Sequence, residues 1–511
     1  MRNTIKKIVL TRGYALAFLT AVIMIVMAAG CADGTDKTDP PGELVQYTVS
    51  GTISSEMVVQ RNSFFNVFGQ SENKGAIIYG EFMCEKRQAV VDENGEWCIQ
   101  FSPHEATTQE QTLKIYPQNG EVKEFDEILI GDVWIITGQS NAELTMAFAL
   151  QKNPEYKEEI SEDDNIRIFT QTREAVMSVK DKVDLTQAQA NIINTRWKWN
   201  KTSFSNVNQF SALGYYFAKE LSRTVDVPLG IVMAAAGGAV LHELMPANVA
   251  DELGFTSAPS VPVSGFYNSL LHPFTKNSIT GMVFYQGESE SCGDQFKTYA
   301  KNLQRTVEEY RKIWRLSFPF INVQLSTHMG DSLSLWPQLP EIRAAQFTAY
   351  QNIPDSYIVT AMDQAFQAGD PDWAHPYYKL ELGKRAASIA AAVVYEKLDI
   401  NYSLCPVPSK ITWEDNSVII DFKYVGDGLK LLSGDEVSGF TAYDEHGGIA
   451  GNSAELVDFN TVKIITTSPA VSVGYGMFPE GTIKKANIGN SSDYPAPAFK
   501  IDKDDIDYRI N

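Results

Sequence analysis

The fold of this chain is decided by residues 131–141, which read Gly131-Asp132-Val133-Trp134-Ile135-Ile136-Thr137-Gly138-Gln139-Ser140-Asn141. The apolar run Val133–Thr137 predicts a buried β-strand, and Gly138 marks the point where that strand breaks into a turn. The turn presents Ser140 at a position fixed by the strand end, beside backbone N–H groups that are free to face a ligand. A serine in this setting is a candidate nucleophile, provided that the rest of the chain supplies partners for it.

Four further apolar runs follow this strand, and helix-length segments separate them. They lie at Gly230–Ala234, Gly281–Tyr285, Phe320–Leu325 and Tyr357–Thr360. Brief apolar runs that alternate with helices predict a parallel sheet covered on both faces, and therefore an α/β domain over residues 127–400. Two of its helices are expected at Tyr215–Leu221 and Leu380–Leu398, and the second of these closes the domain.

The segments on either side of this domain have the pattern of β-structure. Residues 46–126 contain short runs rich in β-formers, such as Trp97–Phe101, and turn signals separate them. Strands at this spacing predict a small β-sandwich. Residues 401–511 return to strands, such as Val418–Phe422, and are expected to form a second small β-domain.

The N-terminus is predicted to direct export. Residues 1–30 combine a basic start with a strongly apolar run from Ala15 to Ala29, which is the pattern of a secretory signal peptide. A membrane-spanning anchor is the alternative, since the run is of borderline length. The segment Met27–Cys31 resembles a bacterial lipobox, which implies cleavage before Cys31 and lipidation of its thiol. Residues 31–45 are then expected to form a polar tether, and the protein is expected to be an exported lipoprotein held on a membrane surface, periplasmic or at the cell surface.

Composition narrows the classes of partner. The chain has 511 residues, of which 44% are hydrophobic, enough for two or three domains with cores of their own. Acidic residues outnumber Lys and Arg by 63 to 43, which gives a formal net charge of −20. Such a surface repels nucleic acid and anionic membrane, and neither is expected as a partner.

The cysteines beyond Cys31 give no sign of a zinc site. They are Cys84, Cys98, Cys292 and Cys405, and they lack the CxxC or Cys/His spacing of metal ligands. Cys84 and Cys98 are close enough in sequence to lie on neighbouring strands, where an exported protein can oxidise them to a disulfide. Two buried free thiols are the equal alternative.

Three short polar motifs each follow directly on a predicted strand. They are Gly138–Ser140, Gly237–Gly238 and Gln286–Glu288. In open α/β sheets the binding site lies at the carboxyl ends of the strands. The three motifs are therefore expected to converge on one crevice.

A serine nucleophile requires a base, and among the six histidines His375 has the best context. Pro376 suits the first turn of the helix that follows, which places His375 at the N-terminal edge of that helix. Asp372 lies three residues earlier, where its carboxylate can fix the tautomer of the ring and stabilise the imidazolium. A surface histidine beside an N-capping aspartate is the alternative. His328, which follows a strand end, and His242, which follows the diglycine, are lesser candidates.

A tetrahedral acyl intermediate also needs fixed donors for its oxyanion. The side-chain amide of Gln286 is one candidate. The backbone N–H groups of Ser140 and of Gly237 or Gly238 are the others, since glycine allows close approach of the backbone. Glu288, just past a strand end, is either a second partner for the base or a structural acceptor. The alternative for both side chains of this motif is an exposed polar loop.

In their order along the chain, these motifs resemble the bacterial sialate O-acetylesterases and related carbohydrate acetylesterases of the SGNH-hydrolase superfamily. The nucleophile block is Gly131–Asn141. The later blocks are Tyr267–Asn268, His272–Pro273, Phe284–Ser289, Trp314–Arg315, Phe318–Phe320, Val323–Leu325, Arg343–Gln346, His375–Pro376 with Lys379, Gly383 and Arg385, then Gly474–Gly476 and Pro495–Phe499. The resemblance covers the chain from about residue 48 to residue 502.

The resemblance implies a three-layer α/β/α SGNH-hydrolase core with a flavodoxin-like parallel sheet, and β-sandwich-like accessory regions at both ends. It implies a serine esterase that removes O-acetyl groups from carbohydrates, with Ser140 as nucleophile and His375 as base. The implied oxyanion hole consists of the Ser140 N–H, the loop of Gly237 and Gly238, and Gln286. The resemblance implies no metal and no organic cofactor.

Departures from the family pattern leave the acid partner of the base open. Many members carry Asp two residues before the histidine, where this chain has Trp373, and Asp372 lies three residues before it. Glu288 is the alternative acid, a role that related acetylxylan esterases suggest for the Gln-Gly-Glu motif. The diglycine stands in Ala235–Ala239 without its usual aromatic and hydroxyl neighbours, which indicates an altered substrate shape rather than lost chemistry.

The expected substrate is an O-acetylated carbohydrate, with an O-acetylated sialate first. Asn141 and Arg343 are expected to bind it, Arg343 as the cation that meets a sugar carboxylate. Acetylated xylan or another plant polysaccharide is the alternative substrate. A non-catalytic glycan-binding lipoprotein is the alternative from another class, and an intact Ser140, Gln286 and His375 argue against it.

Overall fold

The central element of the protein is the long strand β8 (Lys123–Gly138). It is seen in a computed structural model that describes residues 44–170, 198–256, 263–327, 337–364, 375–477 and 486–504. The predicted signal peptide, almost all of the tether with Cys31, and Asp372 lie outside the described residues, as does His328. The predicted strand Val133–Thr137 is the second half of β8, so the predicted domain boundary between residues 126 and 127 falls inside a strand.

Five strands run parallel through the centre of the molecule, in the order β11-β8-β12-β13-β14. The four that flank β8 have the bounds Leu229–Ala235 (β11), Gly281–Tyr285 (β12), Phe320–Gln324 (β13) and Ser356–Thr360 (β14). These bounds lie within one residue of the predicted runs. Nearly every residue in them is buried, because helices cover the sheet and leave no face for polar side chains.

Two strands extend this sheet beyond β11, and the sequence did not indicate them. The strand β9 (Asp163–Thr170) is parallel to β11, and β10 (Trp199–Thr202) is antiparallel to β9. Only the second half of β9 is buried, and it begins with charged residues, so no apolar run announces it. Strands of the N-terminal region also pair with the first half of β8. Together they make an 11-stranded mixed sheet, and the fold is mixed α/β.

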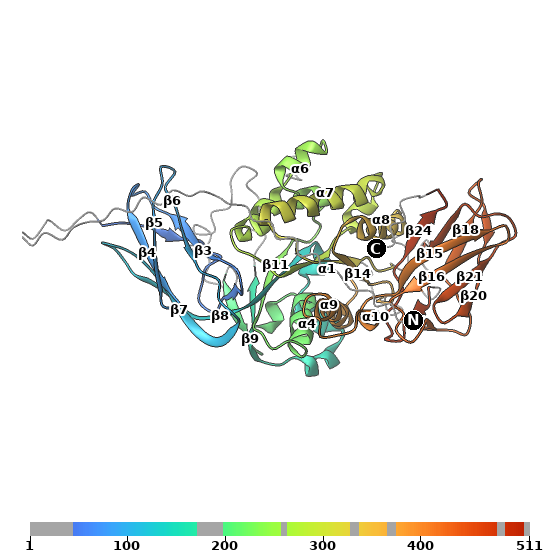
Figure 1. Ribbon diagram of the computed structural model, residues 1–511, viewed down its shortest axis with the longest axis horizontal. Helices are drawn as coiled ribbons and strands as arrows, with labels where there is room; N and C mark the ends of the chain where they lie inside the picture. The colour runs from blue at the N-terminus through green and yellow to red at the C-terminus, as the bar shows by residue number, and fades with distance from the viewer. Residues whose placement is uncertain are drawn as a thin grey trace, which may run out of the picture. The chain divides into compact units, whose positions relative to one another are not determined.

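The helices pack on both faces of the central strands. Figure 1 shows α7 (Phe296–Trp314) and α8 (Leu339–Asn352) on one side, and α4 (Ala212–Ser222) and α9 (Lys379–Val393) on the other. Gly383 lets α4 and α9 approach closely, since a Cβ there would lie 2.6 Å from the Cβ of Tyr216. The short helices are α1 (Ser140–Glu143), α2 (Met146–Lys152), η1 (Pro154–Glu159), η3 (Val207–Gln209), α5 (Leu241–Leu244), α6 (Ala247–Glu252), η4 (Tyr267–Leu271), η5 (His272–Phe274), η6 (Glu288–Ser291) and α10 (Ile400–Ser403).

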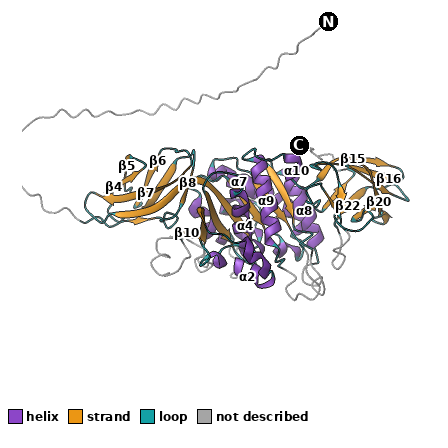
Figure 2. Cartoon of the chain, turned by 90° about the horizontal axis from the view of Figure 1, so that it is seen from below, coloured by secondary structure: helices purple, strands orange, loops and turns teal. Residues whose placement is uncertain are grey.

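The N-terminal region, residues 44–138, consists of strands and the turns between them (Figure 2), and it includes residues 46–126, for which a β-domain was predicted. They are β1 (Thr48–Val49), β2 (Val58–Gln60), β3 (Phe65–Gln70), β4 (Ile77–Phe82), β5 (Glu85–Val90), β6 (Glu96–Phe101) and β7 (Thr107–Pro117). Phe65 of the β1-β3-β6 sheet packs edge-on against Phe82 of β4, at 5.3 Å between ring centroids. Cys84 and Cys98 are both exposed free thiols, so they form neither the disulfide nor the buried pair considered above.

The C-terminal region also consists of strands. One four-stranded sheet has β15 (Val407–Glu414), β16 (Ser417–Lys423), β21 (Thr461–Ile465) and β20 (Ser453–Asp458) in that order. The other has β19 (Ile449–Gly451), β18 (Phe440–Tyr443), β22 (Ser472–Tyr475) and β24 (Phe499–Asp502), while β17 (Lys430–Leu431) pairs with β23 (Ile488–Gly489). Aromatic side chains, among them Phe422, Phe440 and Phe499, fill its core.

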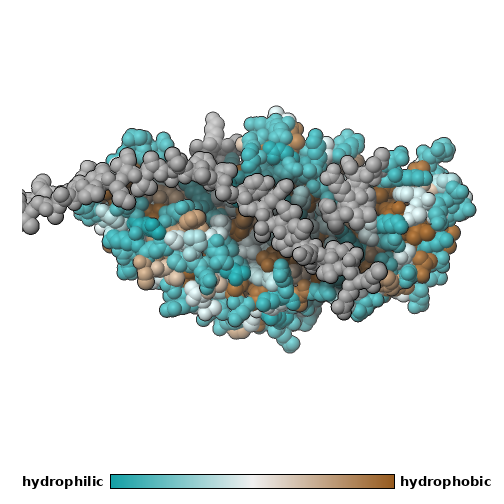
Figure 3. Space-filling model, in the orientation of Figure 1, coloured by the Kyte–Doolittle hydropathy of each residue, from teal (hydrophilic) through white to brown (hydrophobic). Residues whose placement is uncertain are grey.

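The face of the molecule in Figure 3 is largely hydrophilic, with scattered hydrophobic patches. Among the residues that the structure describes, no helix has both the length and the apolar character that a membrane crossing requires.

Candidate active site

Ser140 begins helix α1 directly after β8, at the carboxyl end of the strand. Gly138 makes this turn with φ +131°, and a Cβ on it would lie 2.0 Å from the backbone oxygen of Tyr285 on the neighbouring strand. Only glycine can therefore bring the serine out at this point. The Oγ of Ser140 lies 2.9 Å from Nε2 of His375, so the structure brings together the two residues predicted as nucleophile and base.

His375 lies in the loop before α9, and not at the edge of that helix as predicted. The helix begins at Lys379, because Tyr377 and Lys379 first close a tight turn, with the Lys379 N–H donating to the Tyr377 carbonyl at 2.8 Å. Phe148 of α2 meets the His375 ring edge-on, at 6.2 Å between centroids, and packs on Tyr377 at 4.9 Å. The base thus has an aromatic neighbour that restricts its ring.

Gln286 is fully buried, and its amide is committed to the protein. The Nε2 atom donates to Oε1 of Gln139 (3.3 Å), to the Ala239 carbonyl (3.2 Å) and to the carboxylate of Glu290. Two N–H groups that already face three acceptors leave none for an oxyanion. The predicted role of Gln286 as an oxyanion donor is therefore wrong for this arrangement, in which it holds the loops around the site.

The diglycine loop is fixed on both sides by the side chains of Glu143 and Ser289, for which the sequence predicted no role. The Gly237 N–H donates to Oε2 of Glu143 at 2.6 Å, so this predicted oxyanion donor is occupied. The Gly238 carbonyl accepts from the hydroxyl of Ser289 at 3.2 Å. Glu143 stands three residues after Ser140 on the same turn of α1, a spacing that no motif marks.

Gly238 has the backbone N–H that remains available in this loop. From Ala236 to Leu241, each other N–H donates to an acceptor in the described part of the chain. Gly238 itself is exposed, with φ +77°. The Ser140 N–H likewise has no acceptor inside its helix, because Ser140 is the first residue of α1. Two of the predicted backbone donors thus fit an anion at this strand end.

Asn141, Lys379 and Glu288 form a continuous polar contact beneath the nucleophile. The ammonium of Lys379 donates to Oδ1 of Asn141 at 2.7 Å, and Nδ2 of Asn141 donates to Oε1 of Glu288 at 2.5 Å. Asn141 is 1% exposed, so it lies too deep to bind substrate as predicted. Glu288 bonds to Asn141 and not to His375, and its other oxygen has no hydrogen-bond partner among the described residues. Its predicted role as the acid that orients His375 is therefore corrected.

Two buried carboxylates lie in the short helix η6. Burial raises the pKa of Glu288 to about 7, while the Asn141 hydrogen bond and the Lys379 charge act in the opposite direction. Burial also raises the pKa of Glu290 to about 7, against the hydrogen bonds from the Leu241 N–H and Gln286. Both acids occupy a region of low dielectric, where fixed donors are needed to hold charge.

Arg343 lies on α8 with 2% of its surface exposed. Its guanidinium donates to the Ser326 carbonyl and to the Gly476 carbonyl, each at 3.2 Å. The predicted contact of Arg343 with a sugar carboxylate is therefore wrong here, since the side chain holds the C-terminal region against the central domain. The sequence could not distinguish the two roles, because an arginine in this motif looks the same whether it is buried or binds a ligand.

The site as a whole suits acyl transfer. It combines a serine at 2.9 Å from an imidazole, two backbone N–H groups that have no acceptor among the described residues, and a buried polar support. The fold agrees with this chemistry. A solved carbohydrate acetylesterase from Xanthomonas citri aligns with 89% of this chain and 100% of its own, at a TM-score of 0.75 and 24% sequence identity. The shared fold is that of a carbohydrate esterase.

Comparison of sequences gives the particular family. Residues 130–391 match the family described as carbohydrate esterase, sialic acid-specific acetylesterase, and the chain belongs to this family. Relatives include the sialate O-acetylesterase of Pongo abelii, 23% identical over 437 residues, and that of Homo sapiens, 22% identical over 437 residues. Each alignment covers 74% of this chain and 77% of the relative. The protein is thus an enzyme that hydrolyses O-acetyl esters of carbohydrates.

Proposed function

We propose that this enzyme deacetylates carbohydrates with Ser140 as the nucleophile and His375 as the general base. We also propose that its preferred substrate is an O-acetylated sialate. The observation that carries the proposal is the 2.9 Å contact between Ser140 Oγ and His375 Nε2 at the carboxyl end of the central strand. Family membership supports the choice of a sialate.

The proposed reaction has two halves. Ser140 Oγ attacks the acetyl carbonyl while His375 Nε2 takes its proton, and the resulting oxyanion accepts from the N–H groups of Ser140 and Gly238. His375 then protonates the sugar oxygen as the C–O bond breaks, which leaves an acetyl-serine. Water, deprotonated by His375, attacks this ester, and His375 returns the proton to Ser140 Oγ as the acyl C–O bond breaks. This releases the free serine and acetic acid, which ionises to acetate.

Asp372 is proposed as the acid that orients His375. It lies outside the described residues, and the proposal follows from its three-residue spacing to the histidine and from the commitment of Glu288 to Asn141. A carboxylate on Nδ1 holds the ring in the tautomer whose Nε2 accepts the serine proton.

The finer fold assignment is also a proposal. We infer an SGNH-hydrolase core, because the order β11-β8-β12-β13-β14 corresponds to the 2-1-3-4-5 order of flavodoxin-like sheets once β9 and β10 are set aside. The strands on either side form β-sandwich-like accessory regions in this interpretation.

We further propose that the enzyme is an exported bacterial lipoprotein attached through Cys31, in the periplasm or at the cell surface. The basic start and the apolar run Ala15–Ala29 before Cys31 support this. Radiolabelled palmitate should enter the wild-type chain in cells and should not enter Cys31→Ala. Equal labelling of both would overturn the lipid anchor.

The test of function is acetate release by Ser140→Ala. We expect the rate to fall to that of buffer, whereas the exposed-serine control Ser205→Ala keeps the wild-type rate. A fluorophosphonate probe should label the wild type and the control but not Ser140→Ala, which also distinguishes an enzyme from a non-catalytic glycan-binding protein. Retained turnover in Ser140→Ala would refute the mechanism. A panel of O-acetylated sialic acids and acetylated xylo-oligosaccharides then tests the substrate, and faster release from the xylo-oligosaccharides would favour the alternative.

A further inference from the structure

We infer that Lys379, Asn141 and Glu288 form a buried bridge that sets the position of Ser140 against His375. The inference rests on the proposed function, because it assigns a purpose to the contact between these two residues. The three members of the buried bridge are positioning residues: they act through their neighbours in the chain and not on the substrate.

The buried bridge connects the segments that carry the reacting groups. Asn141 is the residue after Ser140 in α1, and Lys379 is the first residue of α9, four residues after His375. Glu288 begins η6 and belongs to the Gln286–Glu288 motif. A single amide therefore joins the nucleophile segment to the base segment through its oxygen, and to the loop around the site through its nitrogen.

The charges at the two ends make the buried bridge hard to break. Lys379 is fully buried, with Nζ 5.1 Å from the centroid of the Tyr285 ring, and Glu288 is 5% exposed. Asn141 presents its oxygen to the ammonium and its N–H to the carboxylate, so that each charge meets the favourable end of the amide dipole. Removal of the charge at one end leaves the other charge in a region of low dielectric with less compensation, which is more costly than the loss of an exposed pair.

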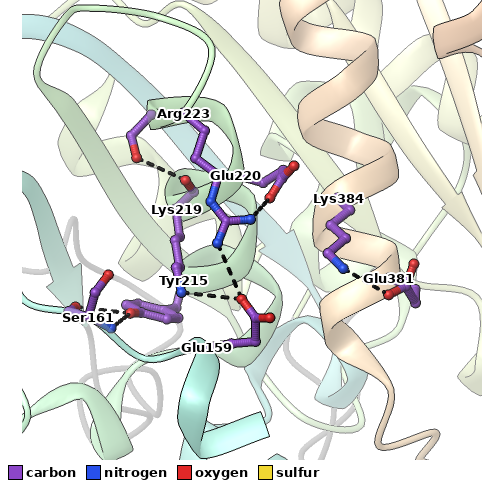
Figure 4. Close-up of polar contacts among 9 residues, drawn as sticks. Glu159, Ser161, Tyr215, Lys219, Glu220, Arg223, Glu381 and Lys384 are labelled. Carbon is purple, nitrogen blue, oxygen red and sulfur yellow. Dashed lines mark hydrogen bonds and ion pairs between the residues drawn. The ribbon is translucent and has the colours of Figure 1, made fainter.

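A second lysine on α9 shows the contrast. Lys384 contacts Glu381 at 3.2 Å, and their side chains are 33% and 42% exposed. Figure 4 shows this pair as a contact between neighbouring turns of one helix, apart from the partly exposed network of Glu159, Lys219, Glu220 and Arg223. Exposed pairs of this kind are screened by water and restrain the backbone little. Lys384 and Glu381 therefore serve as matched controls.

The experiment measures kcat and KM for acetate release by the full-length chain. In Lys379→Met we expect kcat to fall about 100-fold, because a displacement of about 1 Å at a reacting group has that cost, while KM changes less than about twofold. Lys384→Met should keep both constants. Glu288→Gln should lose kcat in the same way, and Glu381→Gln should not.

The double variant Lys379→Met/Glu288→Gln distinguishes the buried bridge from independent roles. Both ends of the buried bridge are then neutral. We therefore expect the kcat of the double variant to be at least about tenfold higher than if the two single losses simply multiplied. The double variant also answers the concern that Lys379→Met fails to fold, since its melting temperature should recover toward that of the wild type.

The inference is overturned if Lys379→Met keeps the wild-type kcat, or if the two losses simply multiply in the double variant. A loss in Glu288→Gln alone, with a shifted acid limb in the pH profile, would return Glu288 to the role of orienting His375. Ser140→Ala separates these outcomes from failure of the proposed function. An inactive Ser140→Ala beside a fully active Lys379→Met overturns only the buried bridge, whereas an active Ser140→Ala overturns the function on which it rests.

Discussion

The two β-rich regions join the central sheet at opposite ends of its strands, and they do so by different means. The N-terminal region feeds into the start of the sheet through β8, which belongs to both. The C-terminal region docks where the parallel strands end: Ala498 contacts Gln324, the last residue of β13, and Gly476 lies against Met362, just after β14. The carboxyl ends of these strands are also where Ser140 and the diglycine loop lie.

We call the contact between the N-terminal region and the central sheet the N-terminal joint. It is formed mostly by the continuous backbone of β8 and by a shared hydrophobic core. A single hydrophobic cluster contains Phe65 of that region together with Trp134 and Phe284 of the central sheet. Asn277, before β12, is one of the side chains that add hydrogen bonds here: it accepts from the Asn66 N–H at 2.8 Å and donates to the Asn66 carbonyl at 3.1 Å. Asn277 is only half-buried, so water competes for these bonds.

At the C-terminal joint, the contact between the C-terminal region and the central domain, a buried side-chain amide likewise bonds to both backbone groups of one residue. Gln324, at the end of β13, accepts from the Ala498 N–H and donates to the Ala498 carbonyl, both at 2.8 Å. The C-terminal region has its own core, to which the central domain contributes Phe347 and Ile358. Without a shared strand, this joint depends on a few side chains.

The position of each joint decides what it can affect. Next to Gln324, the Leu325 N–H donates to Oε1 of Gln346 at 2.9 Å, and Nε2 of Gln346 donates to the Gln286 carbonyl at 3.0 Å. Polar contacts therefore run from the C-terminal joint into the loop that supports the site. The N-terminal joint lies a full strand length away, so damage there should reduce stability without reducing the rate.

Gln324→Leu should give the largest effect. It leaves the N–H and carbonyl of Ala498, the Arg343 carbonyl and the Thr360 hydroxyl without the partner they have in the wild type. Each buried group left unpaired costs about 1–3 kcal/mol, so we expect a loss of more than about 3 kcal/mol in the free energy of unfolding. Because the contacts continue to Gln286, kcat should also fall by about tenfold.

Calorimetry and acetate release check this prediction. The control is Gln100→Leu on β6, which loses one exposed hydrogen bond to Asn66 and should change neither quantity. An unchanged kcat in a destabilised Gln324→Leu would show that the C-terminal joint is not coupled to the site.

The strands of the central sheet could be predicted because a buried strand has a recognisable apolar sequence. A strand covered on both faces must be apolar throughout, and the runs at Gly281–Tyr285 and Tyr357–Thr360 meet this condition. The first half of β8 has one face outside this core and contains Lys123, Glu124 and Glu127, so it shows no such run. The predicted domain boundary fell inside β8 for this reason.

The hydrogen-bond partners of polar side chains cannot be recognised from the sequence in this way. Gln286, Glu288 and Arg343 occupy positions that the family pattern marks, yet each bonds to a group distant in sequence, which only the folded chain brings near. Lys379 was noted as part of the pattern without a role. Its signal was a lysine at the start of an otherwise buried helix, and this signal equally suits an exposed charge.

Asn277→Ala, the equivalent change at the N-terminal joint, should have a moderate effect. Two half-buried hydrogen bonds are lost, and β8 still connects the two regions, so we expect a loss of about 1 kcal/mol in the free energy of unfolding. Both kcat and KM should match those of the wild type, because in the described residues the hydrogen bonds of Asn277 do not continue to the site. A fall in kcat as large as that of Gln324→Leu would remove the distinction between the joints.

Lys201→Met should give the smallest effect and tests the exposed edge of the N-terminal joint. Lys201 of β10 contacts Glu110 of β7 at 3.1 Å and also Glu127 of β8, and the three side chains are 28%, 47% and 43% exposed. Exposed ion pairs contribute less than about 1 kcal/mol, so the melting temperature should fall only slightly in low salt. In 1 M NaCl, where the Debye length is about 3 Å, it should equal that of the wild type. A larger loss that persists in salt would mean that this joint, like the C-terminal one, depends on specific side chains rather than on the continuity of β8.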